Sequence, residues 1–94
     1  MKNSNKRNRG FPCPCCEYLT RSTEVAGTHE ICPICRWEDD FGQFKDPRLD
    51  GGANDMSLEE ARGNFIKYGA KSQEDKLKVR APLADEYPLK LLKR

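Results

Sequence analysis

Long hydrophobic runs are absent from this sequence. No apolar stretch approaches the roughly 18 to 20 residues that span a bilayer, and residues 1–10 lack the apolar stretch of a signal peptide. We therefore expect a cytoplasmic protein without a membrane segment. Hydrophobic residues make up 36% of the 94 residues, too little for side chains alone to build a sizeable core. The chain forms one domain at most, and something besides apolar packing must stabilise it.

Histidine is also scarce, since His29 is the only one. A single histidine leaves little scope for a Ser/His/Asp or Cys/His nucleophile system, and the sequence has no glycine-rich phosphate-binding loop. Deaminase chemistry needs a His-x-Glu segment upstream of Pro-Cys-x-x-Cys, whereas His29 follows Pro12 to Cys16 and is adjacent to Glu30. These absences favour a protein that is not an enzyme.

The net charge of +2 conceals a division along the chain. Residues 1–10 carry +4, residues 11–70 carry −5 (six basic and eleven acidic side chains), and residues 71–94 carry +3. An acidic folded part with basic ends is a poor electrostatic match for a phosphate backbone. We interpret residues 1–10 as a disordered basic tail and residues 83–94 as a C-terminal tail.

Five cysteines are present, and four of them can supply the missing stabilisation. They form two C-x2-C pairs, Cys13 with Cys16 and Cys32 with Cys35, separated by 15 residues. This spacing is typical of a tetrahedral four-cysteine zinc site. A reducing cytosol also favours metal ligands over disulfides. We expect one zinc ion per chain, although four thiolates alone do not distinguish zinc from iron.

Two further residues near the pairs, Cys15 and His29, are weaker candidates for a reactive thiol and a metal ligand, respectively. Cys15 is the spare cysteine, because pairing Cys13 with Cys15 would be too tight for the usual turn. Such a thiol can act as a redox sensor or nucleophile, but a position between two ligands more often only packs. His29 could complete a mixed site, yet with four well-spaced cysteines we interpret it as a hairpin residue.

The remaining pattern predicts a small metal-stapled α+β fold. We expect a zinc-ribbon-like β-hairpin with two C-x2-C turns over residues 11–36, in which residues 18–20 and 28–31 pair across a turn at Ala26-Gly27. Residues 37–56 are rich in turn formers and predict a loop. A packed helix follows over residues 57–69, and the whole domain covers residues 11–82.

The helix prediction rests on its end signals and on one stripe of side chains. Ser57 can cap the start and Gly69 can end the helix. The apolar stripe has spacings of 3, 4 and 3, which places its members on one face. These residues are Leu58, Ala61, Phe65 and Tyr68. Because Gly63 in mid-helix costs about 1 kcal/mol relative to alanine, the helix needs tertiary support.

An acidic run follows the second cysteine pair directly. Glu38, Asp39 and Asp40 come after Trp37, and Asn54 closes a glycine-rich turn further along. Clustered carboxylates can bind a hard cation or serve acid/base chemistry, whereas the simpler alternative is a solvated loop. We expect Trp37 to cover the cysteine turn or the helix stripe. If it is partly exposed, it would instead anchor a partner or ligand surface formed with the other four residues.

The residues as a group resemble a known bacterial family, the cysteine-rich CPCC proteins. The resemblance covers roughly residues 11 to 82, with several motifs in order. They are Cys13-Pro14-Cys15-Cys16, Tyr18-Leu19-Thr20, Glu30-Ile31-Cys32-Pro33-Ile34-Cys35, Trp37-Glu38-Asp39-Asp40, Gly51-Gly52-Ala53-Asn54, Ser57-Leu58, Glu60-Ala61-Arg62, Asn64-Phe65 and Gly69-Ala70. The resemblance implies a small metal-binding domain with its helix packed on the cysteine hairpin, and brings no settled reaction or substrate.

One position departs from the family pattern. Glu17 stands where such proteins often have glycine, so we expect a looser or mildly strained backbone after Cys16.

Several functions are compatible with these features. The leading hypothesis is a zinc-binding protein-interaction module in which the metal is structural. The alternatives are a rubredoxin-like iron protein for electron transfer, a nucleic-acid-binding zinc ribbon that uses the basic termini, and an enzyme that uses Cys15 or residues 38–40.

Overall fold

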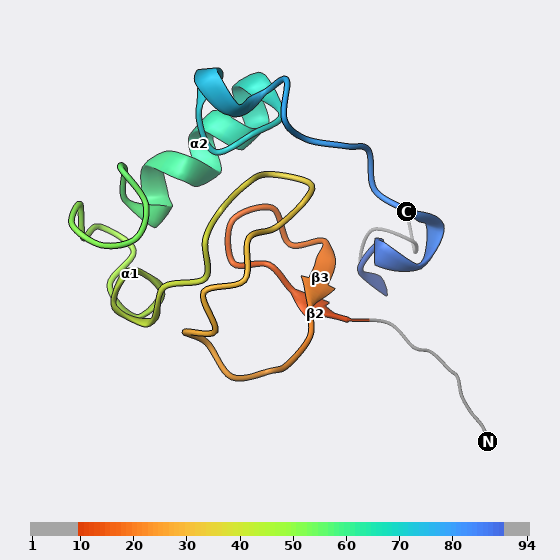
Figure 1. Cartoon of the computed structure of the whole chain (residues 1–94), viewed down its shortest axis with the longest axis horizontal. Helices are drawn as coiled ribbons and strands as arrows, with labels where there is room; N and C mark the ends of the chain where they lie inside the picture. Colours follow the sequence, from red (N-terminus) through yellow and green to blue (C-terminus); the bar gives the residue numbers. More distant parts are fainter. Residues whose placement is uncertain (1–9, 90–94) are drawn as a thin grey trace.

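The computed structural model describes residues 10–89. Its elements are β2 (Phe11–Pro12), β3 (Leu19–Arg21), α1 (Phe41–Lys45), α2 (Leu58–Tyr68) and two 3-10 turns, η1 (Gln73–Asp75) and η2 (Ala84–Glu86) (Figure 1). The predicted tails lie mostly outside this range, at residues 1–9 and 90–94. In the described part of the chain, no helix has the length and apolarity needed to cross a bilayer.

The strand pairing differs from the predicted hairpin. β2 and β3 are antiparallel and flank the first cysteine turn, with Phe11 opposite Arg21 and Pro12 opposite Leu19. The second cysteine turn is flanked by an isolated bridge between Ile31 and Glu38. The predicted pairing of residues 18–20 with 28–31 is therefore wrong. Instead, the residues on either side of each cysteine turn pair with each other. Their backbone groups are then no longer available for a hairpin between the two cysteine pairs.

Residues 37–56 are not entirely loop, which corrects a second prediction. Asp40 caps α1, since its Oδ1 accepts a hydrogen bond from the Gln43 N–H at 2.9 Å. Gln43 is fully buried, and its Nε2 donates to the carbonyl oxygens of Leu49, Asn54 and Met56. The short helix thus positions the side-chain amide of Gln43, whose hydrogen bonds hold the backbone of the following loop in place. An aspartate before two phenylalanines spaced by three was the available signal.

Helix α2 agrees with the prediction for residues 57–69. Ser57 Oγ accepts from the Glu60 N–H at 3.1 Å, and Gly69 ends the helix in the left-handed region at φ 82°. Leu58 and Ala61 are fully buried against the cysteine turns, and Phe65 packs beside them. The cysteine turns and the helix stripe therefore share one core.

That core is small, and half of its buried residues are cysteines. Its buried members are the five cysteines together with Ile34, Trp37, Met56, Leu58 and Ala61. The low hydrophobic content of the sequence is consistent with this arrangement, because a bound metal can hold together what apolar area alone cannot.

The chain after α2 returns across the cysteine turns. The Lys71 N–H donates to the Cys35 carbonyl at 2.7 Å, and the Arg80 N–H donates to the Pro33 carbonyl at 3.1 Å. Beyond residue 82, where we predicted a tail, η2 contacts β3 and the Tyr87 ring packs on Tyr18. The C-terminal segment is thus packed as far as Tyr87, because the aromatic contact offsets the conformational entropy lost when the segment is ordered.

Candidate metal centre

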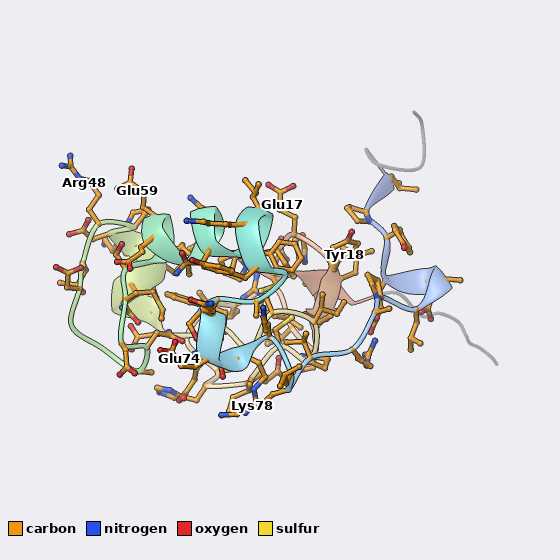
Figure 2. All side chains as sticks on the ribbon, turned by 90° about the horizontal axis from the view of Figure 1, so that it is seen from above. Glu17, Tyr18, Arg48, Glu59, Glu74 and Lys78 are labelled. Carbon is orange, nitrogen blue, oxygen red and sulfur yellow. The ribbon has the colours of Figure 1, made fainter. Side chains whose placement is uncertain are left out.

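The first cysteine turn is closed by two backbone hydrogen bonds. The Cys13 N–H donates to the Tyr18 carbonyl and the Glu17 N–H donates to the Cys13 carbonyl, both at 2.8 Å. Glu17 has φ 73°, a left-handed conformation that favours glycine. The expected backbone strain at this departure from the family pattern is therefore present. Figure 2 shows Glu17 next to Tyr18 at the edge of the domain.

The second cysteine turn repeats this geometry. The Cys32 N–H donates to the Trp37 carbonyl at 2.9 Å, and the Arg36 N–H donates to the Cys32 carbonyl at 2.8 Å. Arg36 has φ 75°, nearly the same as its counterpart in the first turn. Two equivalent turns can present two sulfurs each to one point between them.

The four paired cysteines converge. The Sγ atoms of Cys13, Cys16, Cys32 and Cys35 all lie within 4.8 Å of one another. The Cys13–Cys35 sulfur distance is 3.6 Å and the Cys16–Cys32 distance is 3.7 Å. A regular tetrahedron with metal–sulfur bonds of about 2.3 Å has edges of about 3.8 Å. All four residues are buried, and no disulfide joins them. This arrangement is a candidate metal centre.

Three groups donate hydrogen bonds to the sulfurs. The Ile34 N–H points at Cys32 Sγ and the Trp37 N–H at Cys35 Sγ, each at 3.4 Å. The Thr20 hydroxyl donates to Cys32 Sγ at 3.2 Å. Such donors partly offset thiolate charge and orient the ligands. The role of Thr20 was missed in the sequence, because a hydroxyl reaching a ligand from β3 depends on the strand pairing.

The thiols influence one another strongly. Hydrogen bonds from Cys13 and Cys16 lower the pKa of Cys32, with Thr20 contributing in the same direction. Hydrogen bonding to Cys13 raises the pKa of Cys35 and of Cys16, and burial acts in the same sense. Four buried thiolates therefore repel unless a cation lies between them. A divalent metal would supply that charge and would be held by these four sulfurs.

Cys15 and His29 lie outside the cluster. Cys15 is 5% exposed and lines a hollow beside α2 with Arg62 and Phe65, and its reactivity stays a prediction. His29 is exposed, and its Nδ1 lies 3.2 Å from Glu38 Oε2. Among residues 10–89, the group that gathers for a metal contains neither of them.

The predicted partner surface is largely an interior feature, which corrects our expectation. Trp37 and Asp39 are each 1% exposed and Asn54 is 3% exposed. Asn54 exchanges two hydrogen bonds with the backbone of Glu38, at 2.8 and 2.9 Å. The hydrogen bond from the Gln43 N–H, followed by that from Ala53, lowers the pKa of the Asp40 carboxyl. The Asn54 and Asp40 side chains therefore form hydrogen bonds with backbone groups of the loop and are not free to bind a partner.

Asp39 shows why an acidic residue can be buried here. Its Oδ2 accepts from the Gly27 N–H, the Thr28 N–H and the Thr28 hydroxyl, each at 3.0 Å. Arg21 Nη1 lies 3.5 Å from the same oxygen. A carboxylate that receives several donors and a guanidinium tolerates burial. The carboxylate thus anchors the segment between the two cysteine pairs.

Together these observations define a small α+β domain whose centre is a four-cysteine cluster suited to a metal ion. The model of the cysteine-rich CPCC family matches residues 11–86, and the chain belongs to that family. The comparison with curated proteins finds no significant match.

Proposed function

We propose that this protein binds one structural zinc ion and serves in the cytosol as a non-catalytic interaction module. The observation that carries the metal assignment is the buried sulfur tetrahedron of Cys13, Cys16, Cys32 and Cys35. Four thiolates fill the coordination shell of zinc and leave no open position for water or substrate. A cytosolic location keeps these thiols reduced.

Metal content and the visible spectrum test this assignment. Protein purified from cells without added metal should be colourless and contain one zinc per chain. Removing the metal with a chelator should unfold the domain, because structural zinc supplies on the order of 10–16 kcal/mol in small domains. A red protein containing iron would instead support electron transfer, and native chemical shifts in the metal-free protein would contradict a structural metal.

Matched cysteine variants make the test specific. Cys35→Ser removes a ligand from the cluster and should lose stoichiometric zinc together with the dispersed NMR spectrum. Cys15→Ala changes a buried cysteine outside the cluster and should keep both. Equal zinc loss in the two variants would contradict the proposed ligand set.

The interaction role is supported by a groove beside the first cysteine turn. Its volume is about 530 Å3, and its apolar lining comes from Pro12, Pro14, Phe44 and Pro88. The charged residues Glu17, Arg21 and Arg62 also line it. The Arg62 side chain is exposed while its Nε donates to the Pro14 carbonyl at 2.9 Å. We propose that the occupant is a segment of another protein with an apolar side chain next to a carboxylate, which would meet the arginine.

Site-specific photo-crosslinking tests the groove. A photoreactive phenylalanine analogue at Phe44 should form a discrete adduct in cells, and the same analogue at exposed Leu77, outside the groove, should not. Excess wild-type protein should suppress the adduct, whereas excess Phe44→Ser should not. Equal adducts from both positions, or equal suppression by both competitors, would overturn the groove assignment without affecting the zinc assignment.

A further inference from the structure

Two buried polar atoms lie close to the metal turns without a protein hydrogen-bond partner. Among the buried side-chain atoms of residues 10–89, these are Trp37 Nε1 and Asp39 Oδ1. Both residues are 1% exposed. The contrast within Asp39 is sharp, because its other oxygen accepts three hydrogen bonds and faces Arg21. Buried polar groups are nearly always paired in folded proteins.

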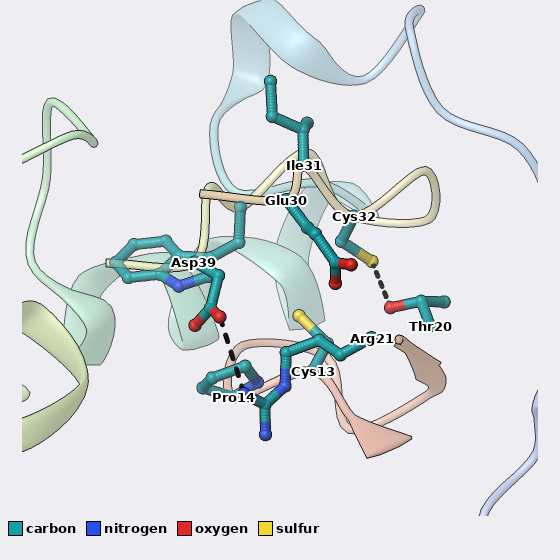
Figure 3. Close-up of a pocket in the computed structure, with 9 residues that line it drawn as sticks. Cys13, Pro14, Thr20, Arg21, Glu30, Ile31, Cys32 and Asp39 are labelled. Atoms are coloured by element: carbon teal, nitrogen blue, oxygen red, sulfur yellow. Dashed lines mark hydrogen bonds and ion pairs between the residues drawn. The ribbon is translucent and has the colours of Figure 1, made fainter. Parts of the chain in front are cut away.

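A small cavity adjoins both residues. Trp37 and Asp39 line it together with Thr20, Arg21 and the metal-site residues Cys13 and Cys32 (Figure 3). The volume of the cavity is about 10 Å3. A cavity that holds one ordered water is of roughly this size, and the water needs two to four polar partners. The cavity therefore has room for one water and not for an organic ligand.

The chemistry of the two atoms selects the occupant. Trp37 Nε1 can only donate a hydrogen bond, and the Asp39 carboxylate can only accept one. A cation would face the indole N–H, and an anion would face the carboxylate. A molecule that both accepts and donates satisfies both atoms.

We propose that the cavity binds a single structural water that accepts from Trp37 Nε1–H and donates to Asp39 Oδ1. Its second proton then faces the sulfur side of the cavity, where Cys13 and Cys32 lie. The water joins the Thr20 hydroxyl as a donor available to the metal ligands. It also links the carboxylate that anchors residues 27 and 28 to the metal centre.

Water–protein NMR on the metal-loaded, 15N-labelled chain tests this site. Trp37 is the only tryptophan, so the indole Hε1 gives one unambiguous signal. A water held longer than nanoseconds should give laboratory-frame and rotating-frame cross-peaks of opposite sign at Hε1. The absence of any water cross-peak at Hε1 would overturn the proposal.

Exchange of the Thr20 hydroxyl could relay the same signal, and Thr20→Val separates the two sources. The cross-peak should persist in this variant if the water is present, and its disappearance would mean that the hydroxyl carried it. A high-resolution crystal structure supplies a second readout. Density within hydrogen-bond distance of both Trp37 Nε1 and Asp39 Oδ1 is expected, whereas a direct bond between those atoms, or an ion in the cavity, would overturn the proposal.

Discussion

The Tyr87 ring packs edge-on against the Tyr18 ring, with centroids 5.2 Å apart and planes at 85°. The Tyr18 carbonyl accepts the Cys13 N–H that closes the first cysteine turn. Tyr18 also meets Phe65 of α2, at a centroid distance of 6.3 Å. Tyr18 thus connects the C-terminal segment and α2 through its ring, and the first cysteine turn through its backbone carbonyl.

We expect Tyr87→Ala to destabilise the metal-loaded protein. An edge-on aromatic pair contributes about 0.5–1.5 kcal/mol beyond its buried area. For a domain of this size, 1 kcal/mol lowers the melting temperature by roughly 4–8 °C. Thermal unfolding at fixed zinc concentration measures the change. Leu77→Ala is the control, since Leu77 is 92% exposed, and an equal shift in both variants would contradict a specific role for the aromatic pair.

Thr20→Val should weaken metal binding while preserving side-chain shape. The variant removes the hydroxyl donor 3.2 Å from Cys32 Sγ. Loss of a ligand-orienting hydrogen bond typically costs 10–100-fold in metal affinity. Competition with a chromophoric chelator measures this change. Thr23→Val is the matched control, because the Thr23 hydroxyl accepts from the Val25 N–H instead. Unchanged affinity for Thr20→Val would show that the hydroxyl does not tune the site.

Two glycines of α2 should respond to alanine in opposite directions. Gly63 has no atom within 4 Å of an added Cβ, and a mid-helix glycine costs about 1 kcal/mol relative to alanine, so Gly63→Ala should stabilise. Gly69 has equal space but φ 82°, so Gly69→Ala should destabilise. Melting temperatures of the two variants test this pair. The same sign of change in both would contradict the assigned backbone conformations.

The Arg80–Glu86 pair should contribute to stability only above mildly acidic pH. The two guanidinium–carboxylate contacts are both 2.8 Å, and the hydrogen bond from Arg80 lowers the pKa of Glu86 below its ordinary value. A lowered folded-state pKa gives stabilisation that is complete above the unfolded value and is lost as pH falls through the folded value.

Glu86→Gln isolates this contribution, since metal release in acid affects both proteins. The melting-temperature difference between wild type and Glu86→Gln should be largest at neutral pH. It should begin to shrink as pH falls below about 4.5. A difference that grows toward acid would contradict the lowered pKa.

The four clustered cysteines and the main helix could be predicted from the sequence because both depend on local signals. The spacing within each C-x2-C pair places two sulfurs on one turn, whatever surrounds it. Ser57 and Gly69 mark the ends of α2 through hydrogen bonding and backbone conformation close to those residues. Only the convergence of the two pairs needed the tertiary fold, and the sulfur distances now describe it.

The strand partners and the acidic run were decided by tertiary structure. Residues 28–31 have β-prone side chains, yet their environment is set by the second cysteine turn, so Ile31 pairs with Glu38 instead of a residue of β3. Asp39 lies in an acidic run that the sequence alone does not distinguish from a solvated loop, but it is buried, whereas the burial of Trp37 beside the cysteine turns agrees with the expectation. Composition describes the average environment of a segment, whereas burial of one carboxylate depends on donors that come from distant residues.

By itself, therefore, the sequence determined the two cysteine turns, the capped helix α2 and the small size of the apolar core. The tertiary structure alone decided what lies around the sulfurs and beyond them: the Thr20 hydroxyl from β3, the buried Trp37 side chain in the same core, and, past the expected domain end, the Tyr87 ring that packs on Tyr18. The physical reason is the sequence separation over which each kind of interaction acts. Turn and cap signals act within a few residues, while packing and hydrogen bonding around a metal centre join segments that only the folded chain brings together.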